Sequence, residues 1–211
     1  TRERYTILTS VPSWGHDDLD APPKVAVLFK GKPGGRIVKT IEEQFHCPEF
    51  MLVQVQEHGS YRSEDVVKAL DWILPPATCP EESIVVLLDW YSGHRTDEVE
   101  ELLQRKGHVL LFHGGGTTPF TQVNDTHLHA LVQRHMIQIE NELALARRRE
   151  DLRCGRHVTP SLKRPDILHV VKTMWRSINH KNAAEKGYRQ TGPEMASEGP
   201  ILRDDVFADL G

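Results

Sequence analysis

Hydrophobic and polar positions along the chain follow two spacings, one typical of strands and one typical of helices. Ranges 5–11, 24–30 and 51–57 are rich in β-branched and aromatic residues and predict strands. The uninterrupted apolar run at 84–88 predicts a strand buried on both faces, and 108–112 predicts a second short buried strand. The pattern therefore indicates a domain built around a sheet.

Four further ranges repeat apolar residues at helical spacing, and residues at their borders favour helix ends. Ser63 is a natural N-cap for the first helix, and Pro75 with Pro76 stops it. Thr96 can cap the second, and Gly107 suits its end because glycine tolerates a positive φ. Pro165 falls in the first turn of the last helix. The predicted helices are 63–74, 97–105, 126–149 and 165–179.

The order of these elements predicts an α/β fold with a mixed sheet flanked by helices. Residues 1–150 form the core in this interpretation, and residues 151–211 add a basic connector over 151–164, a helical appendage and a tail. The last helix can begin a separate unit near 150–160, or it can dock on the core. The sequence leaves both placements open.

Composition narrows the class of protein. The chain has 211 residues and a formal net charge of −4, which argues against a uniformly basic nucleic-acid binder. The stretch from Arg134 to Arg164 is different, because it contains eight Lys and Arg residues and four Asp and Glu residues, which gives a local net charge of +4. Three isolated cysteines favour a reduced intracellular compartment over a disulfide framework. No apolar run approaches the roughly 20 residues of a membrane span, so no membrane partner is expected.

Two carboxylates stand at the ends of ordered segments. Asp89 closes the apolar run at 84–88, and Asp125 closes the segment 117–125 just ahead of the long helical pattern. Two carboxylates held in this way can share divalent cations for phosphodiester chemistry, and Mg²⁺ or Mn²⁺ prefers such oxygen ligands. Asp89 and Asp125 are therefore the candidate catalytic and metal-binding residues.

The segments around these acids resemble a known family, the DDE-superfamily endonuclease domain of pogo/Tigger-like, mariner-related transposases. Asp89 is followed by a small-residue turn with His94 and Thr96, as in the family's second acid motif. The loop 114–118 and the motif Gln122-Val123-Asn124-Asp125 are similar to the family's third acid motif. The 35 residues between the acids fit its usual interval.

The resemblance covers nearly the whole chain. Residues 27–32 look like the family's Phe-Lys-Gly-Lys segment, residues 55–72 like the segment ahead of the second acid, and residues 165–192 like the tail after the nuclease core. The family's first acid lies on a strand just before a segment that 4–10 resembles. The expectation is an N-terminally truncated core that lacks its first strand and is catalytically incomplete as it stands.

The resemblance implies an RNase H-like fold and divalent-metal-dependent cleavage and transfer of DNA strands. Asp89 would flank both cations and Asp125 would ligate one of them, with Mg²⁺ (or Mn²⁺) as cofactor. DNA is the implied partner, a homodimer is a further candidate, and the nucleus is the implied location. The alternative is a domesticated, non-catalytic domain that binds DNA or protein. Val123 in place of the family's proline and the Gly114–Gly116 triplet favour that alternative.

Other residues complete the set of candidates. His94 can orient a metal-bound water or contact a phosphate, or it can have a structural role in its turn. Gln122 can cap or position the loop that carries Asp125 and is a candidate nucleic-acid contact with His94. Arg147, Arg148 and Arg149 can bind DNA phosphates or form a solvated helix end. Trp90, beside Asp89, is the tryptophan placed to reach a nucleotide.

Two further classes are disfavoured. A zinc site at His127, His129 and His135 is disfavoured, since 127 and 129 cannot share a helical face and no cysteine is near. A hydrolase with a nucleophilic serine is disfavoured because there is no Gly-x-Ser-x-Gly motif.

Overall fold

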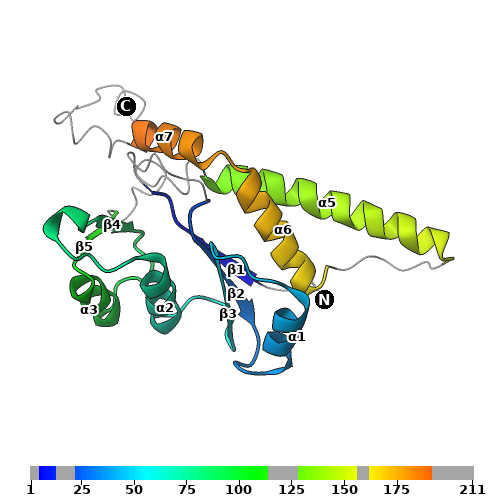
Figure 1. The fold of residues 1–211 in the computed structure, drawn as a ribbon, viewed down its shortest axis with the longest axis horizontal. Helices are drawn as coiled ribbons and strands as arrows, with labels where there is room; N and C mark the ends of the chain where they lie inside the picture. Colours follow the sequence, from blue (N-terminus) through cyan, green and yellow to red (C-terminus); the bar gives the residue numbers. More distant parts are fainter. Residues whose placement is uncertain (1–4, 13–21, 114–127, 156–161, 192–211) are drawn as a thin grey trace, which may run out of the picture.

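The structure is a computed structural model that describes residues 5–12, 22–113, 128–155 and 162–191 (Figure 1). Its first sheet has the strand order β1-β2-β3, formed by β1 (Tyr5–Thr9), β2 (Val25–Lys30) and β3 (Met51–Gln56). β1 runs antiparallel to β2, with Ile7 opposite Val27, and β2 runs parallel to β3. All three strands lie where the sequence predicts them.

A second sheet holds two parallel strands, β4 (Val85–Leu88) and β5 (Val109–Phe112). Its register sets Val85 opposite Val109 and Leu88 opposite Phe112. Helix α3 (Asp97–Arg105) connects the two strands. Parallel strands need such a crossover, because a tight turn cannot bring the chain back to the same end of the sheet.

The remaining regular elements of the described chain are helices, which confirms a mixed α/β class. The predicted helices at 63–74 and 97–105 are present, and the long helix and the last predicted helix are present with shifted ends. Two helices, α1 and α7, are not among the predictions. Besides α3, the elements are α1 (Arg36–Gln44), α2 (Ser63–Ile73), the short 3-10 helix η1 (Pro80–Glu82), α5 (His129–Arg153), α6 (Arg164–Ser177) and α7 (His180–Thr191).

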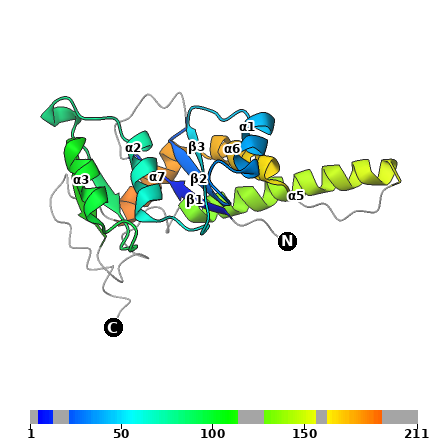
Figure 2. The same ribbon diagram turned by 90° about the horizontal axis from the view of Figure 1, so that it is seen from below.

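The β1–β3 sheet is covered on both faces, and Figures 1 and 2 show the two helical layers on opposite sides of it. On one face Val27 and Phe29 pack in a core shared with α1, α5 and α6. On the other face Ala26 and Leu28 pack in a core shared with α2, α3 and β4. Because α6 shares a core with β2, the last predicted helix docks on the sheet. It is not part of a separate unit.

Three expectations from the sequence are wrong. The runs at 84–88 and 108–112 are not the buried strands expected, since Val85 is 59% exposed and Leu87 38%, and Val109 and Leu111 opposite them are also exposed. Among the described residues, the covered face of this small sheet is the one that packs on α2 and α3. The connector expected to begin at 151 begins later, since α5 continues to Arg153.

The third error concerns the cap of α2. Ser63 is the first helical residue, and Arg62 occupies the N-cap position. The Arg62 backbone N–H donates to Asp65 Oδ2 at 3.2 Å, so a carboxylate within the first turn satisfies the backbone there. Pro75 follows the end of the helix as expected, and Gly107, at φ 77°, ends α3 as expected.

Two lysine side chains donate hydrogen bonds to carbonyls at the C-terminal end of α2. Lys24 Nζ, from the residue before β2, donates to Trp72 O at 2.6 Å and Ile73 O at 3.2 Å. Lys106 Nζ, from the turn before β5, donates to Asp71 O at 2.5 Å and Leu74 O at 2.6 Å. Burial, and then the charge of Lys106, lower the pKa of Lys24. The starts of β2 and β5 therefore lie at one end of α2.

Removing either lysine is expected to leave the carbonyls that it binds at the end of α2 without their charged donor. Lys24→Met and Lys106→Met should each lower the free energy of unfolding by about 1–3 kcal/mol, the range for hydrogen bonds to charged groups. Urea unfolding followed by circular dichroism measures the change. Lys39→Met, at an exposed position on α1, is the matched control and should change stability by less than about 0.5 kcal/mol. Equal losses in all three variants would contradict this role.

Candidate functional site

Asp89 follows the last residue of β4 and lies at the carboxyl end of the parallel pair β4–β5. Its side chain is 37% exposed. One carboxylate oxygen, Oδ1, accepts the backbone N–H of Tyr91 at 3.2 Å. The strand fixes the backbone and this turn contact fixes the carboxylate, so the group is held while still open to solvent.

His94 lies against the same carboxylate oxygen. The turn Tyr91–His94 brings His94 Nδ1 to 2.5 Å from Asp89 Oδ1, as an ion-pair contact without the alignment of a hydrogen bond. The His94 side chain is 14% exposed, so it is more enclosed than the acid. The structure thus places His94 beside Asp89, and its contact with a metal-bound water or a phosphate stays a prediction.

Two tyrosines, which the sequence reasoning missed, support this turn. The Tyr91 ring meets the His94 ring edge to face at 5.4 Å, and its hydroxyl donates to Tyr61 O at 2.8 Å. A Cβ at Gly93 would lie 2.8 Å from Tyr91 Cε1, so glycine at this position allows the ring to pass. The Tyr91-x-Gly93 spacing is the feature of the sequence that could have indicated this packing. The end of β4 is in this way attached to the start of α2.

Asp89 and His94 border a groove of about 930 Å³. One wall is β1 with the residues that follow it, the other is β4, and Val66, Leu70 and Ile73 of α2 line the groove as well. His113 and His129 also line it. The sequence reasoning missed His113, although it follows β5 as Asp89 follows β4, a position where parallel sheets often place functional groups. The His113 backbone N–H donates to Leu88 O at 2.9 Å, next to the acid.

Trp90 faces outward beside the acid. It is 51% exposed, the Arg95 guanidinium lies 4.5 Å from its ring centroid, and its ring meets Phe112 edge to face at 5.6 Å. An exposed indole with a guanidinium on it presents both an apolar and a cationic surface. This agrees with the placement expected of Trp90 beside Asp89.

Asp125 and Gln122, the other residues of the predicted acid pair and loop, lie outside the described residues, as does His127. Their distance from Asp89 therefore stays a prediction. The two described histidines of the disfavoured zinc set differ in their surroundings. His129 lines the groove, whereas His135 Nδ1 lies 2.9 Å from Leu131 O, one turn back along α5.

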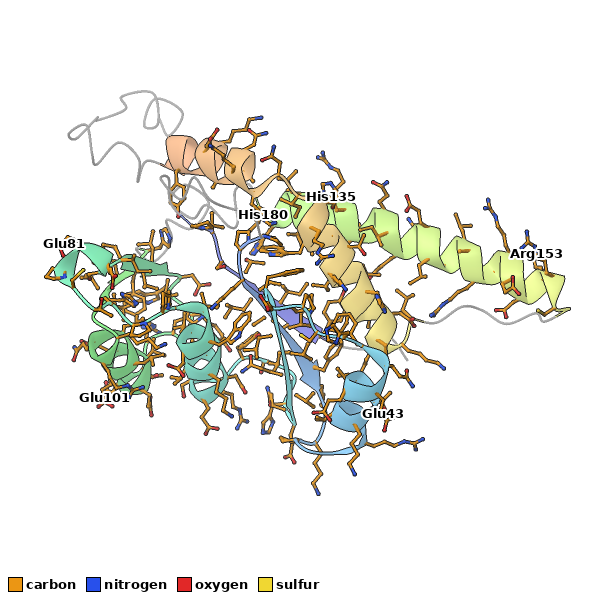
Figure 3. The ribbon with its side chains drawn as sticks, in the orientation of Figure 1. Glu43, Glu81, Glu101, His135, Arg153 and His180 are labelled. Atoms are coloured by element: carbon orange, nitrogen blue, oxygen red, sulfur yellow. The ribbon has the colours of Figure 1, made fainter. Side chains whose placement is uncertain are left out.

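The three candidate arginines of the basic segment, Arg147, Arg148 and Arg149, lie near the end of α5 and not beside Asp89. Arg147 forms an ion pair with Asp166 and so joins α5 to the start of α6, while Arg148 and Arg149 are exposed. Figures 1 and 2 show the end of α5 far from β4 and α3, and Figure 3 shows Arg153 at that outer end with Glu81 and Glu101 at the opposite side of the molecule. Arg147 thus has a structural contact, and the arginines and the acid occupy separate regions.

The described part of the chain holds no group of three His, Cys, Asp or Glu side chains arranged for a metal ion. Asp89 itself fits a hard divalent cation, since it offers a fixed, partly exposed carboxylate at the border of a groove. Further ligands for a three-residue set would have to come from outside the described residues, where Asp125 lies. Within the described residues no helix combines the length and apolarity of a membrane span.

Comparison with known proteins gives no relative from which to transfer a function. No family model, no curated protein and no solved structure matches the chain. The functional assignment therefore rests on the residues and the geometry described above.

Proposed function

We propose that this chain is an RNase H-like, DDE-type nuclease domain of transposase descent, which cleaves and transfers DNA strands with a divalent cation. The observation that carries the proposal is the position of Asp89. It is a partly exposed carboxylate at the carboxyl end of a parallel strand pair, in contact with His94 and bordering a large groove.

The directions of the strands support the fold assignment. The starts of β2 and β5 lie at the C-terminal end of α2, next to Lys24 and Lys106. The turn after β4 contacts Tyr61, just ahead of the start of α2. The parallel strands of the two sheets thus point the same way, helices cover both faces of the β1–β3 sheet, and Asp89 lies at the carboxyl ends of the parallel strands. Open α/β sheets commonly bind ligands at that edge.

Asp89 would hold the cation, with Asp125 and the acid expected upstream of the segment 4–10 as further ligands. The bound cation would activate the attacking hydroxyl or water and neutralise charge on the leaving oxygen. His94 keeps the carboxylate of Asp89 oriented, and the Tyr91 backbone N–H keeps one of its oxygens pointing into the turn. Trp90 and Arg95 present an exposed surface beside the acid that suits a nucleotide.

Manganese binding tests this proposal. In the chain extended upstream to include the expected first acid, Mn²⁺ should bind, and Asp89→Asn should weaken binding at least about tenfold in titration calorimetry, because a charged ligand is lost while volume is conserved. Asp97→Asn, which removes an exposed carboxylate from the first turn of α3, is the control and should leave the affinity unchanged. Retained DNA binding without any Mn²⁺ binding would reject the nuclease and favour the domesticated, non-catalytic domain.

A further inference from the structure

Exposed cations gather at the end of β2, on the loop that follows it and at the start of α1. From Val25 to Ile41 the sequence contains four Lys and Arg residues and no Asp or Glu. All four are exposed, and none forms an ion pair with another described residue. We call them the α1 cations: Lys30, Lys32, Arg36 and Lys39. Such a group creates a positive potential over this surface.

The charges along α1 run against the helix dipole. The first turn of a helix favours acids, and the last turn favours cations. α1 begins with Arg36 and Lys39 and has no acid in its first turn. Its last turn contains Glu42 and Glu43 and no cation. α2 and α3 follow the usual rule, since each has acids in its first turn. α1 thus holds cations where they do not stabilise the helix, a departure from local preference that is typical of functional surfaces.

The α1 cations lie at the same edge of the molecule as Asp89. β2 ends at Lys30 and runs parallel to β3, which ends at Gln56. Asp89 follows the end of β4, which points the same way as these two strands. The loops after β2, β3 and β4 therefore share the carboxyl edge of the parallel strands.

The loop after β3 crosses this edge and connects the two regions. A Cβ at Gly59 would lie 2.9 Å from Lys30 Cβ, so glycine at this position lets the loop pass directly over the end of β2. Two residues later, Tyr61 O accepts the hydroxyl of Tyr91 at 2.8 Å. The Tyr91 backbone N–H in turn donates to Asp89 Oδ1 at 3.2 Å. A short chain of contacts thus joins the surface at Lys30 to the carboxylate.

The spacing of the α1 cations suits a row of phosphates. Six residue steps separate Lys30 from Arg36, and an extended chain of that length spans at most about 20 Å. One strand of B-form DNA carries a phosphate about every 3.4 Å along the axis, so the cations can face up to about six consecutive phosphates. We propose that the α1 cations bind the DNA backbone beside the groove and position the duplex whose scissile step lies at Asp89. The inference rests on the proposed function.

DNA binding by the 211-residue chain tests the proposal. Fluorescence anisotropy of a labelled duplex is measured in EDTA at several salt concentrations, so that no metal ion takes part. Lys30→Gln, Lys32→Gln and Arg36→Gln combined should weaken binding at least about tenfold at low salt. The slope of log affinity against log salt should fall by about 2–3, since each lost phosphate contact removes about 0.9. Unchanged affinity and slope, or no DNA binding by the wild type, would overturn the proposal.

A matched triple variant controls for net charge. Lys68→Gln, Arg105→Gln and Lys186→Gln combined remove the same charge from exposed positions on α2, α3 and α7 and should leave the slope unchanged. Equal losses in both triple variants would overturn the proposal.

A single substitution gives a second test with little risk to folding. Lys39→Gln, at an exposed helix position, should lower the slope by about 0.9 without lowering the melting temperature, because a cation near the start of a helix does not stabilise it. An unchanged slope for Lys39→Gln together with unfolding of the triple variant would also overturn the proposal.

Failure of this proposal is distinct from failure of the nuclease proposal. Mn²⁺ binding that depends on Asp89, together with DNA binding that ignores the α1 cations, would reject the DNA surface alone. DNA binding that depends on the α1 cations, in a chain that binds no Mn²⁺, would reject the nuclease alone.

Discussion

Trp175→Ala is expected to lower the free energy of unfolding by about 3–5 kcal/mol, the range for truncating a buried tryptophan. Trp175 lies in α6, is fully buried, and packs in the core that α6 shares with β2. Its Nε1–H donates to Pro23 O at 2.5 Å, and its ring lies 4.5 Å from the ring of His180 in α7. The substitution therefore opens a cavity and leaves the Pro23 carbonyl without its donor. Urea unfolding followed by circular dichroism measures the loss.

Trp175→Phe separates the cost of the lost indole hydrogen bond from the cost of the cavity. Phenylalanine keeps an aromatic ring in the core but removes the indole N–H, so Pro23 O is left without that donor at a cost of about 1–3 kcal/mol. The alanine variant should be clearly less stable than the phenylalanine variant. A loss below about 1 kcal/mol for Trp175→Ala would mean that α6 does not help to hold the sheet.

Asp89→Ala is expected to reduce metal-dependent nicking of supercoiled DNA by on the order of 10³-fold in the upstream-extended chain. A catalytic cation contributes several kcal/mol of transition-state stabilisation, and each 1.36 kcal/mol is a factor of about ten. The alanine removes the one described carboxylate that is held at the border of the groove with His94 against it. Gel separation of supercoiled and open-circular plasmid, in Mg²⁺ and in Mn²⁺, gives the rate.

Two controls make the nicking result specific. Asp97→Ala removes a carboxylate from the exposed first turn of α3, only eight positions along the chain, and should nick at the wild-type rate. Circular dichroism of Asp89→Ala should match the wild type, because Asp89 lies after β4 and outside both hydrophobic cores. Nicking by Asp89→Ala at the wild-type rate would remove this residue from the mechanism.

Much of the secondary structure could be predicted because local signals and tertiary packing agree. The strand at 25–30 is apolar from Val25 to Phe29 and is central in its sheet, and the α3 stripe of Val99, Leu102 and Leu103 is buried as its spacing predicts. α1 and α7 escaped prediction. α1 has Gly35 at its N-cap position and no side-chain cap, and α7 is mostly polar, so its sequence resembles that of a loop.

The exposure of β4 could not be predicted, because burial depends on neighbours that the strand's own residues do not specify. An apolar run such as 84–88 is typical of a central strand, yet β4 has a single neighbouring strand and one uncovered face among the described elements. The site was predictable in part. Asp89 and His94 meet because only four residues separate them, whereas 35 residues separate Asp89 from Asp125, which lies outside the described residues.

The length of α5 bears on how a duplex could lie on this protein. His129, its first residue, lines the groove, and Arg148 is 19 residues further, which at about 1.5 Å per residue is roughly 28 Å along the axis. One turn of B-form DNA measures about 34 Å. Under the proposed function, a double helix that follows α5 would present to Arg148 and Arg149 a backbone stretch nearly one full turn from the end of the groove that His129 lines. Contacts there would set the register of the duplex from a distance without touching the scissile step.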